Sequence, residues 1–303
     1  MTASLAQSIK ARLLGRVHQH GEEFELILVR FVCERFLYRL GRSDWRDSCA
    51  LKGAGLLQLW MGDPYRSTRD VDLLAQGDNS ERAVKRMMMN ICAISCTEDG
   101  LQFDLDSLTA RPLRASQEYQ GQRATMVVYL GTARIRLQVD FGFGDAVTPQ
   151  PRQRMYPTLI EDLPAPQILV YPREAAIAEK FEAMVTLGTR NSRMKDFHDI
   201  WALSESFGFD GRELCAAVSA CFERRRTPWT DELPAVLTSS FYADDDAIMR
   251  WDSYLRKGAF LEPPPDEFAV IGSSVRRFLG PVREGIVGKG GTELKWQPGG
   301  PWQ

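Results

Sequence analysis

The 303 residues are enough for two modest domains or one elaborated domain, and their composition is that of an ordinary globular protein. A formal net charge of -2 excludes a strongly basic chain, so any nucleic-acid contact must come from a local patch. Only Cys92 and Cys96 among six cysteines are closely spaced, which argues against a zinc site and favours reduced thiols. No apolar run reaches membrane-spanning length, and we expect a cytoplasmic protein without membrane contact.

Two amphipathic helices are predicted at the N-terminus, over residues 3–17 and 22–40. In both segments apolar residues recur at intervals of three or four, which places them on one side of a helix. Gly41 closes the second helix. We therefore expect residues 1–44 to form a helical layer that packs on the rest of the protein.

The segment from Leu51 to Leu74 predicts a short helix, a turn and a strand. A glycine-containing entry leads into apolar residues at helical spacing, and Gly62 begins the turn that ends this helix. Asp70 and Asp72 then lie on one face of the strand, because side chains alternate between its two faces. Neighbouring carboxylates repel each other unless a cation lies between them. Such oxygen ligands favour a divalent metal whose coordination is completed by nucleotide phosphates.

The KGAGLL and RSTRDVDLL segments of this stretch resemble the catalytic motif of polymerase-β-like nucleotidyltransferases. The amino-acid sequences of these two segments are similar to those of the abortive-infection nucleotidyltransferase toxins of the AbiEii/AbiGii type. Where that family often has Gly-Ser or Gly-Gly, this chain has Gly53-Ala54, so backbone amides alone would contact phosphate. The resemblance implies an NTP substrate. The residues expected at the nucleotide in this region are Lys52, Gly53, Ala54, Ser67, Thr68 and Arg69.

One helix and three short strands are predicted next. They span residues 80–96, 103–105, 125–130 and 133–141. In the last strand Asp140 alternates away from the apolar face, at the place where the resembled family has its third carboxylate. Two metal ions about 3.5–4 Å apart need bridging carboxylates to hold a triphosphate, so Asp140 would complete a site with Asp70 and Asp72. The alternative is that Asp140 only ends a strand before a glycine turn.

A proline-rich, irregular crossing segment is expected over residues 148–172, followed by a helix to about Leu187. The stretch from Glu179 to Leu203 carries a second resemblance to the toxin family, which has a lysine in this helix and a K-D-x-x-D segment after it. The matching residues are Lys180, Lys195, Asp196 and Asp199.

The resemblance places Lys180 and Asp196 among the catalytic residues, and Lys195 and Asp199 at the nucleotide. A lysine aimed at the metal site would neutralise charge on the leaving pyrophosphate. Asp196 and Asp199 share a helix face, and one of them would position Lys180 or receive the proton of the acceptor hydroxyl. The alternatives are a solvated lysine beside an apolar stripe and an exposed i,i+4 ion pair between Lys195 and Asp199.

Further helices are predicted towards the C-terminus. They lie near residues 210–224, 245–256 and 266–279. The run Arg224-Arg225-Arg226 with Trp229 suits a nucleic-acid backbone with a stacked base, and favourable charges at a helix C-terminus explain the arginines equally well. The tail over residues 285–303 is rich in Gly and Pro, and we expect it to be disordered.

The sequence thus predicts an α+β protein with a mixed nucleotidyltransferase-fold sheet over residues 45–150 and a helical C-terminal domain over residues 151–284. The resemblance implies a metal-dependent toxin of a type IV-like toxin–antitoxin system, which transfers an NMP from an NTP to an RNA acceptor, the tRNA 3′ end. Translation would stop as a result. Mg²⁺, with Mn²⁺ as the alternative ion, is the expected cofactor, and NTP, tRNA and a cognate antitoxin are the expected partners.

Two other interpretations stay open. A small-molecule (antibiotic) nucleotidyltransferase would carry the same three carboxylates. A non-catalytic nucleotide-binding partner protein would keep the fold without the activity.

Overall fold

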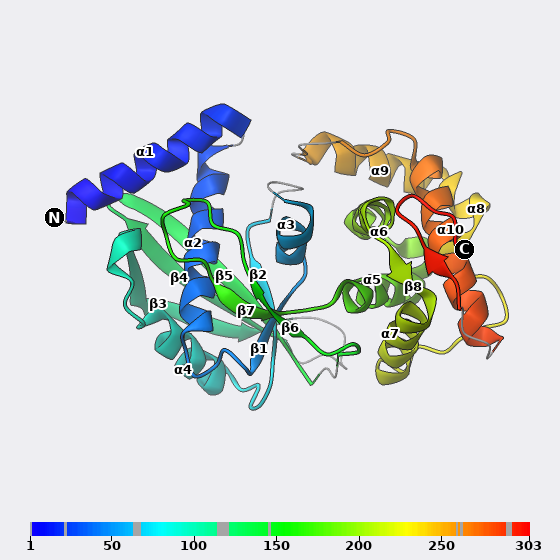
Figure 1. Ribbon diagram of the computed structural model, residues 1–303, viewed down its shortest axis with the longest axis horizontal. Coiled ribbons are helices and arrows are strands. Elements are labelled where there is room, and N and C mark those ends of the chain that lie inside the picture. The colour runs from blue at the N-terminus through cyan, green and yellow to red at the C-terminus, as the bar shows by residue number, and fades with distance from the viewer. Residues whose placement is uncertain are drawn as a thin grey trace. The chain divides into compact units, whose positions relative to one another are not determined.

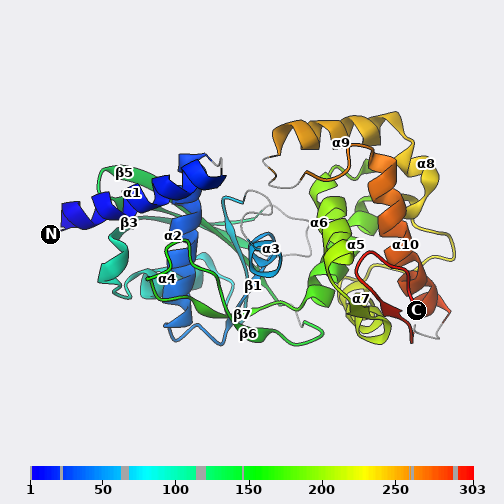
Figure 2. The same ribbon diagram turned by 45° about the horizontal axis from the view of Figure 1, so that its top comes forward.

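The computed structural model describes residues 2–20, 23–62, 68–113, 121–144, 147–258, 260, 263–288 and 293–303. Contacts divide the chain into two compact units, of which the first is Met1–Asp145 with Pro151–Tyr171 and the second is Ala146–Gln150 with Pro172–Gln303. Figures 1 and 2 show that the first unit holds the large sheet and the second is mostly helical. Each unit is described by itself.

A seven-stranded mixed sheet forms the centre of the first unit, with strand order β3-β4-β5-β2-β1-β7-β6. The strands are β1 (Cys49–Lys52), β2 (Val71–Ala75), β3 (Leu101–Pro112), β4 (Gln122–Leu130), β5 (Ala133–Phe143), β6 (Arg152–Met155) and β7 (Gln167–Val170). β2 runs parallel to β5, and β1 runs parallel to β7, while the other neighbours are antiparallel. The predicted mixed sheet is therefore confirmed.

Helices cover one face of this sheet (Figure 1). α2 (Phe24–Gly41) and α4 (Glu81–Cys92) pack on the strands, while α1 (Thr2–His20) packs on α2 and on the 3-10 turn Thr97–Asp99, and α3 (Gly55–Met61) packs on β1. α2 contacts β5, β7 and α4. Every second residue of β5, including Leu137 and Val139, is buried, because strand alternation aims these side chains at the helices. The intervening residues, including Asp140, are left on the opposite face.

The second unit packs helices around an aromatic core. Its elements are α5 (Arg173–Leu187), α6 (Met194–Ser206), α7 (Gly211–Arg224), α8 (Ser239–Tyr242), α9 (Asp245–Lys257), α10 (Phe268–Val287) and the short strands β8 (Phe209–Asp210) and β9 (Lys295–Trp296). α10 packs against α6 and α7, and Phe197, Trp251 and Phe268 form ring contacts between α6, α9 and α10. None of the described helices is long and apolar enough to cross a membrane.

Three sequence predictions need correction. Leu51 and Lys52 belong to strand β1 rather than to a helix entry. The segment expected to be irregular contains β6 and β7, and residues 151–171 belong to the first unit, not to the helical one. These four-residue strands lack a readable alternation. Their structure is decided by long-range pairing, of β7 with β1 and of β6 with β7.

The prediction of a disordered tail is also wrong for the described residues. α10 continues to Val287, and β9 pairs with β8. Trp296 is only 1% exposed, packs on Phe278 and Trp302, and donates a hydrogen bond of 2.7 Å to the Ser204 carbonyl. The large area that two indole rings bury outweighs the flexibility of the glycines and prolines around them.

Candidate active site

Three carboxylates meet on the open face of the sheet in the first unit. Asp72 of β2 lies directly opposite Asp140 of β5 in the parallel ladder, and Asp70 immediately precedes β2. One oxygen from each of the three residues lies within 4.8 Å of the others, and all three side chains are half-buried. The structure therefore brings together the three residues predicted as metal ligands.

This cluster fits a divalent cation. Mg²⁺ binds oxygen at about 2.0–2.1 Å, so two oxygens on one ion lie at most about 4.2 Å apart. A cluster that spans 4.8 Å needs only a small side-chain adjustment to close around an ion. Carboxylate oxygens alone form the hard donor set that Mg²⁺ and Mn²⁺ prefer.

Two polar side chains hold Asp70 in place. Thr68 Oγ1 donates a 2.9 Å hydrogen bond to Asp70 Oδ1, and Gln138 Nε2 donates one of 3.4 Å to Asp70 Oδ2. Thr68, predicted at the nucleotide, thus contacts a carboxylate. Arg69 is largely exposed and lies 4.0 Å from Glu23 Oε2, which is a weak surface pair. Ser67, also predicted at the nucleotide, lies outside the described residues.

Arg123 of β4 is the residue that the sequence prediction missed. It lies opposite Asp140 in the β4–β5 ladder, and its Nε and Nη2 donate to the two Asp140 oxygens at 2.8 and 2.7 Å. This hydrogen bonding raises the pKa of the Arg123 guanidinium. The sequence contains the information needed to find this pair. A two-residue turn at Gly131-Thr132 sets the register of the β4–β5 hairpin, and in this register Arg123 lies opposite Asp140.

Lys52 and Gly53 approach the cluster from β1. Lys52 lies opposite Asp72 in the β1–β2 ladder. Gly53 has φ +68°, and a Cβ at this position would lie 2.0 Å from Asp72 Oδ2. Both the backbone conformation and the space therefore require glycine here. Ala54 follows directly, before α3.

The remaining predicted residues lie in the second unit. Lys180 of α5 donates to Asp196 Oδ1 at 3.2 Å and to Asp199 Oδ2 at 2.6 Å. Both carboxylates are fully buried and the Lys180 side chain is only 12% exposed, while Arg193 Nε lies 2.8 Å from Asp196 Oδ2. The alternative of a solvated lysine is therefore wrong.

The alternative of an exposed Lys195–Asp199 pair is wrong as well, since Asp199 pairs with Lys180. Lys195 lies on the exposed side of α6.

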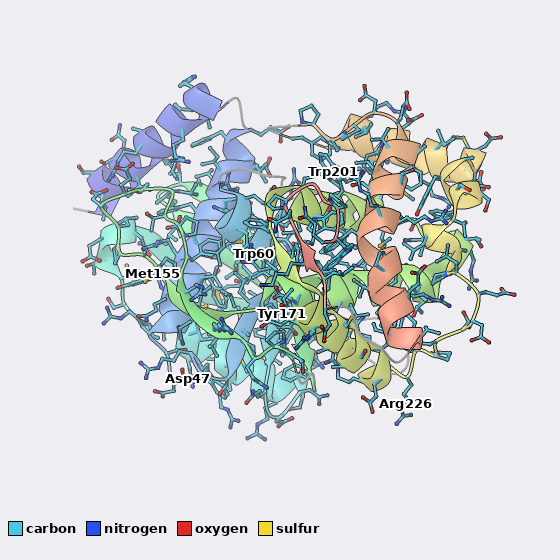
Figure 3. All side chains as sticks on the ribbon, turned by 45° about the vertical axis from the view of Figure 1, so that its right-hand side comes forward. Asp47, Trp60, Met155, Tyr171, Trp201 and Arg226 are labelled. Atoms are coloured by element: carbon cyan, nitrogen blue, oxygen red, sulfur yellow. The ribbon has the colours of Figure 1, made fainter. Side chains whose placement is uncertain are left out.

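The basic run at the end of α7 is used within the protein. Arg225 pairs with Glu182 at 2.5 Å and with Glu179 at 3.6 Å. Trp229 stacks on Phe222 with ring centroids 4.0 Å apart. Arg226 alone projects from the surface (Figure 3). Internal ion pairing and ring packing therefore account for most of the run predicted as a nucleic-acid contact.

A mixed sheet with one carboxylate on a strand, a second just before that strand and a third on the parallel neighbour has the arrangement of a nucleotidyltransferase site. Residues 35–277 match the family model described as "Nucleotidyl transferase AbiEii toxin, Type IV TA system". This chain belongs to that family of nucleotidyltransferase toxins, as its motifs predict.

A solved structure shares the fold. A putative nucleotidyltransferase from Helicobacter pylori is 12% identical, with 88% of this chain and 99% of that chain covered and a TM-score of 0.51. The nucleotidyltransferase toxin MenT4 from Mycobacterium tuberculosis H37Rv is 16% identical, with 93% and 98% covered and a TM-score of 0.49. None of the curated protein sequences is similar enough to this chain to match.

Proposed function

We propose that this toxin transfers a nucleoside monophosphate from an NTP to an RNA acceptor, the 3′ end of tRNA, at a metal site formed by Asp70, Asp72 and Asp140. The observation that carries the proposal is the approach of three carboxylates to within 4.8 Å on one face of the sheet. Such a concentration of negative charge is suited to a divalent cation and poorly suited to an empty surface.

The proposed reaction exchanges a phosphoanhydride bond of the NTP for a phosphodiester bond to the acceptor. The oxygen of the acceptor hydroxyl forms a bond to the α-phosphorus, and the bond from that phosphorus to the oxygen bridging to the β-phosphate breaks. Pyrophosphate leaves, and the hydroxyl proton passes to a carboxylate or to water. A divalent cation bound by the carboxylates would neutralise phosphate charge and lower the pKa of the attacking hydroxyl.

The first unit supplies the nucleotide contacts in this proposal. Gly53 lets the backbone pass directly beside Asp72, so the Gly53 and Ala54 amides are available to the phosphates. Lys52 adds a cation beside Asp72, and Arg69, held by a weak surface pair with Glu23, is proposed to meet the nucleotide. Thr68 fixes Asp70 by its hydrogen bond.

Lys180, in the second unit, is proposed to stabilise the charge that develops on pyrophosphate. Its two partners Asp196 and Asp199 are fully buried, and their hydrogen bonds fix the position of the ammonium group. A preorganised cation of this kind stabilises a transition state without further reorganisation. Lys195 is proposed as an additional nucleotide contact.

The proposed setting is a type IV-like toxin–antitoxin pair in the cytoplasm. Modification of the tRNA 3′ end would prevent aminoacylation and stop growth, and a cognate antitoxin would relieve the effect. Membership of the family described as a type IV toxin supports this setting.

A labelling assay tests the proposal. The purified protein is incubated with Mg²⁺, total cellular RNA and each of the four α-labelled NTPs in turn. Asp72→Asn is the test variant, and Asp47→Asn, which removes an exposed carboxylate before β1, five residues from the Lys52 that opposes Asp72, is the matched control. Label in a tRNA-sized band with wild type and Asp47→Asn, but not with Asp72→Asn, is expected. Absence of label from RNA, with label on an added aminoglycoside instead, would refute the RNA acceptor.

A further inference from the structure

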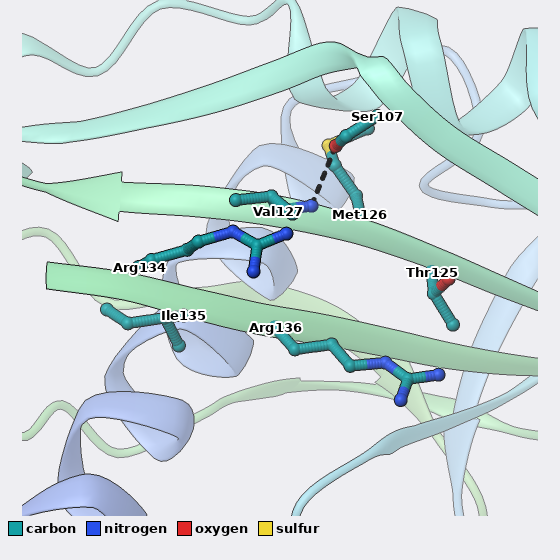
Figure 4. A pocket seen from close by; sticks show the side chains of 7 residues that line it. All are labelled: Ser107, Thr125, Met126, Val127, Arg134, Ile135 and Arg136. Atoms are coloured by element: carbon teal, nitrogen blue, oxygen red, sulfur yellow. Dashed lines mark hydrogen bonds between the residues drawn. The ribbon is translucent and has the colours of Figure 1, made fainter.

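The sheet face that carries the carboxylates continues along β3, β4 and β5, and β5 presents two arginines on it. On β5, Arg134, Arg136 and Gln138 alternate on the same face as Asp140, whereas the residues between them are buried. Arg134 and Arg136 are both exposed, and Figure 4 shows them projecting from β5 beside Val127 and Thr125 of the neighbouring strand β4. We call the pair Arg134 and Arg136, with the hollow beside it, the arginine track.

A bulge in β3 shapes the hollow. Between the pairs Asp104–Val127 and Thr109–Thr125, β3 advances five residues while β4 advances two. Ser107 stabilises the bulge, since its Oγ donates to the Asp104 carbonyl at 2.6 Å and accepts from the Val127 amide at 2.8 Å. The resulting hollow has a volume of about 270 Å³ and is lined on one side by Arg134 and Arg136. Bulges of this kind commonly re-aim side chains beside functional sites.

No ion pair among the described residues neutralises the charges of the arginine track. Among the described residues, neither Arg134 nor Arg136 forms an ion pair with a carboxylate, whereas Arg123 on the same face is bound to both oxygens of Asp140. Two carboxylates lie on the β3 side of the track: Asp104, opposite Val127, and Asp106, which is exposed within the bulge. The track therefore remains available to an external anion.

The distance along β5 decides which anion fits. Arg136 and Arg134 are four and six residues from Asp140, which corresponds to about 14 and 20 Å along a strand. A triphosphate bound at the carboxylates does not extend that far, but a polymer does. Tyr129 of β4, opposite Arg134 and only half-buried, adds a ring beside the track. Exposed arginines with a neighbouring aromatic ring are typical of surfaces that bind single-stranded nucleic acid.

We propose that the arginine track binds the phosphodiester backbone of the acceptor RNA, upstream of the 3′ end that reacts at Asp140. This inference rests on the proposed function, because it assumes an RNA acceptor. It adds a binding surface on the first unit and a direction, with the RNA strand running along β5 towards the carboxylates.

The test measures binding of a fluorescein-labelled single-stranded oligouridylate by fluorescence anisotropy over a range of salt concentrations. The test variant is Arg134→Ala/Arg136→Ala. The matched control is Arg152→Ala/Arg154→Ala, which removes two exposed arginines, also two residues apart on a strand, from β6. Thermal melting and binding of a fluorescent Mg-NTP verify that each protein is folded and has an intact nucleotide site.

The size of the effect follows from counterion release. Two phosphate contacts to a single strand contribute about 1.4 to the slope of log affinity against log salt, which corresponds to about a 25-fold change near 0.1 M salt. We expect the test variant to lose about 25-fold in affinity and about 1.4 in slope, with NTP binding unchanged. The control should lose less than about twofold, since its arginines lie away from the track.

Other results overturn the proposal. Equal losses in the two double variants would mean that net charge alone binds RNA. Unchanged RNA affinity in the test variant, while tRNA is still labelled, would refute the arginine track and leave the proposed function intact. Competition by polyglutamate as effective as that by unlabelled RNA would assign the track to an acidic protein. If wild type labels only a small molecule, both the RNA acceptor and the track fail together.

Discussion

Replacement of Gly53 by alanine gives the sharpest test of the site geometry. The added Cβ would lie 2.0 Å from Asp72 Oδ2, whereas a relaxed contact between carbon and oxygen needs about 3.3 Å. Asp72 must therefore move by more than about 1 Å, a displacement that commonly costs a catalytic constellation about 100-fold. The φ of +68° adds a strain of about 1–2 kcal/mol to the folded state.

Gly131→Ala separates these two effects. Gly131 has φ +56°, and its added Cβ would meet only Ala6 Cβ at 3.3 Å and Lys10 Nζ at 3.7 Å. Neither of these two contacted residues belongs to the site. Urea unfolding should show similar losses of about 1–2 kcal/mol for both variants. Mn²⁺ binding followed by electron paramagnetic resonance, together with NTP turnover, should be impaired only in Gly53→Ala. A folded Gly53→Ala protein with wild-type Mn²⁺ affinity and turnover would refute the metal assignment of Asp72.

Three further predictions follow from the charges. Arg123→Gln frees Asp140 from its bidentate partner, so Mn²⁺ should bind about two- to fivefold more tightly while turnover falls; weaker Mn²⁺ binding would contradict this. Lys180→Met leaves two buried carboxylates without their shared cation, so the free energy of unfolding in urea should fall by about 3–5 kcal/mol. A fall below about 1 kcal/mol would mean that the two carboxylates are exposed to solvent. Burial raises the pKa of Glu34 from its usual 4.5 to about 7, so the folded state holds a proton that the unfolded state releases between these values. Stability should therefore fall by up to about 3 kcal/mol from pH 4.5 to 7 relative to Glu34→Gln, which does not titrate; parallel pH profiles in urea unfolding would contradict this.

Strand alternation made part of the site predictable. A period of two places Asp70 and Asp72 on one face and Asp140 on the outward side of its own strand, and the structure brings their oxygens together. The long helices were predictable for a similar reason, since their apolar stripes extend over several turns. Both patterns are local and repeat often enough to be read from the chain.

The features that the sequence did not predict depend on contacts between residues far apart in the chain. β1, β6 and β7 have four residues each, and only their neighbours in the sheet make them strands. The packing of Trp296 on Phe278 and Trp302 was equally invisible, because it joins α10 to the end of the chain. In the helical unit, the K-D-x-x-D spacing brings Asp196 and Asp199 onto one face of a helix but does not reveal that both are buried around Lys180.

The strand register explains how the carboxylates are tolerated before a metal binds. Asp72 and Asp140 lie directly opposite each other, a like-charge pair that destabilises a sheet. Lys52 lies opposite Asp72 on one side and Arg123 opposite Asp140 on the other, so a row across four strands carries charges in the order plus, minus, minus, plus. This row is neutral by itself, and Asp70 is the carboxylate in excess. A divalent cation that binds Asp140 must therefore compete with the two hydrogen bonds from Arg123 or bind Asp140 together with Arg123. Arg123 thus determines the metal affinity as well as the position of Asp140.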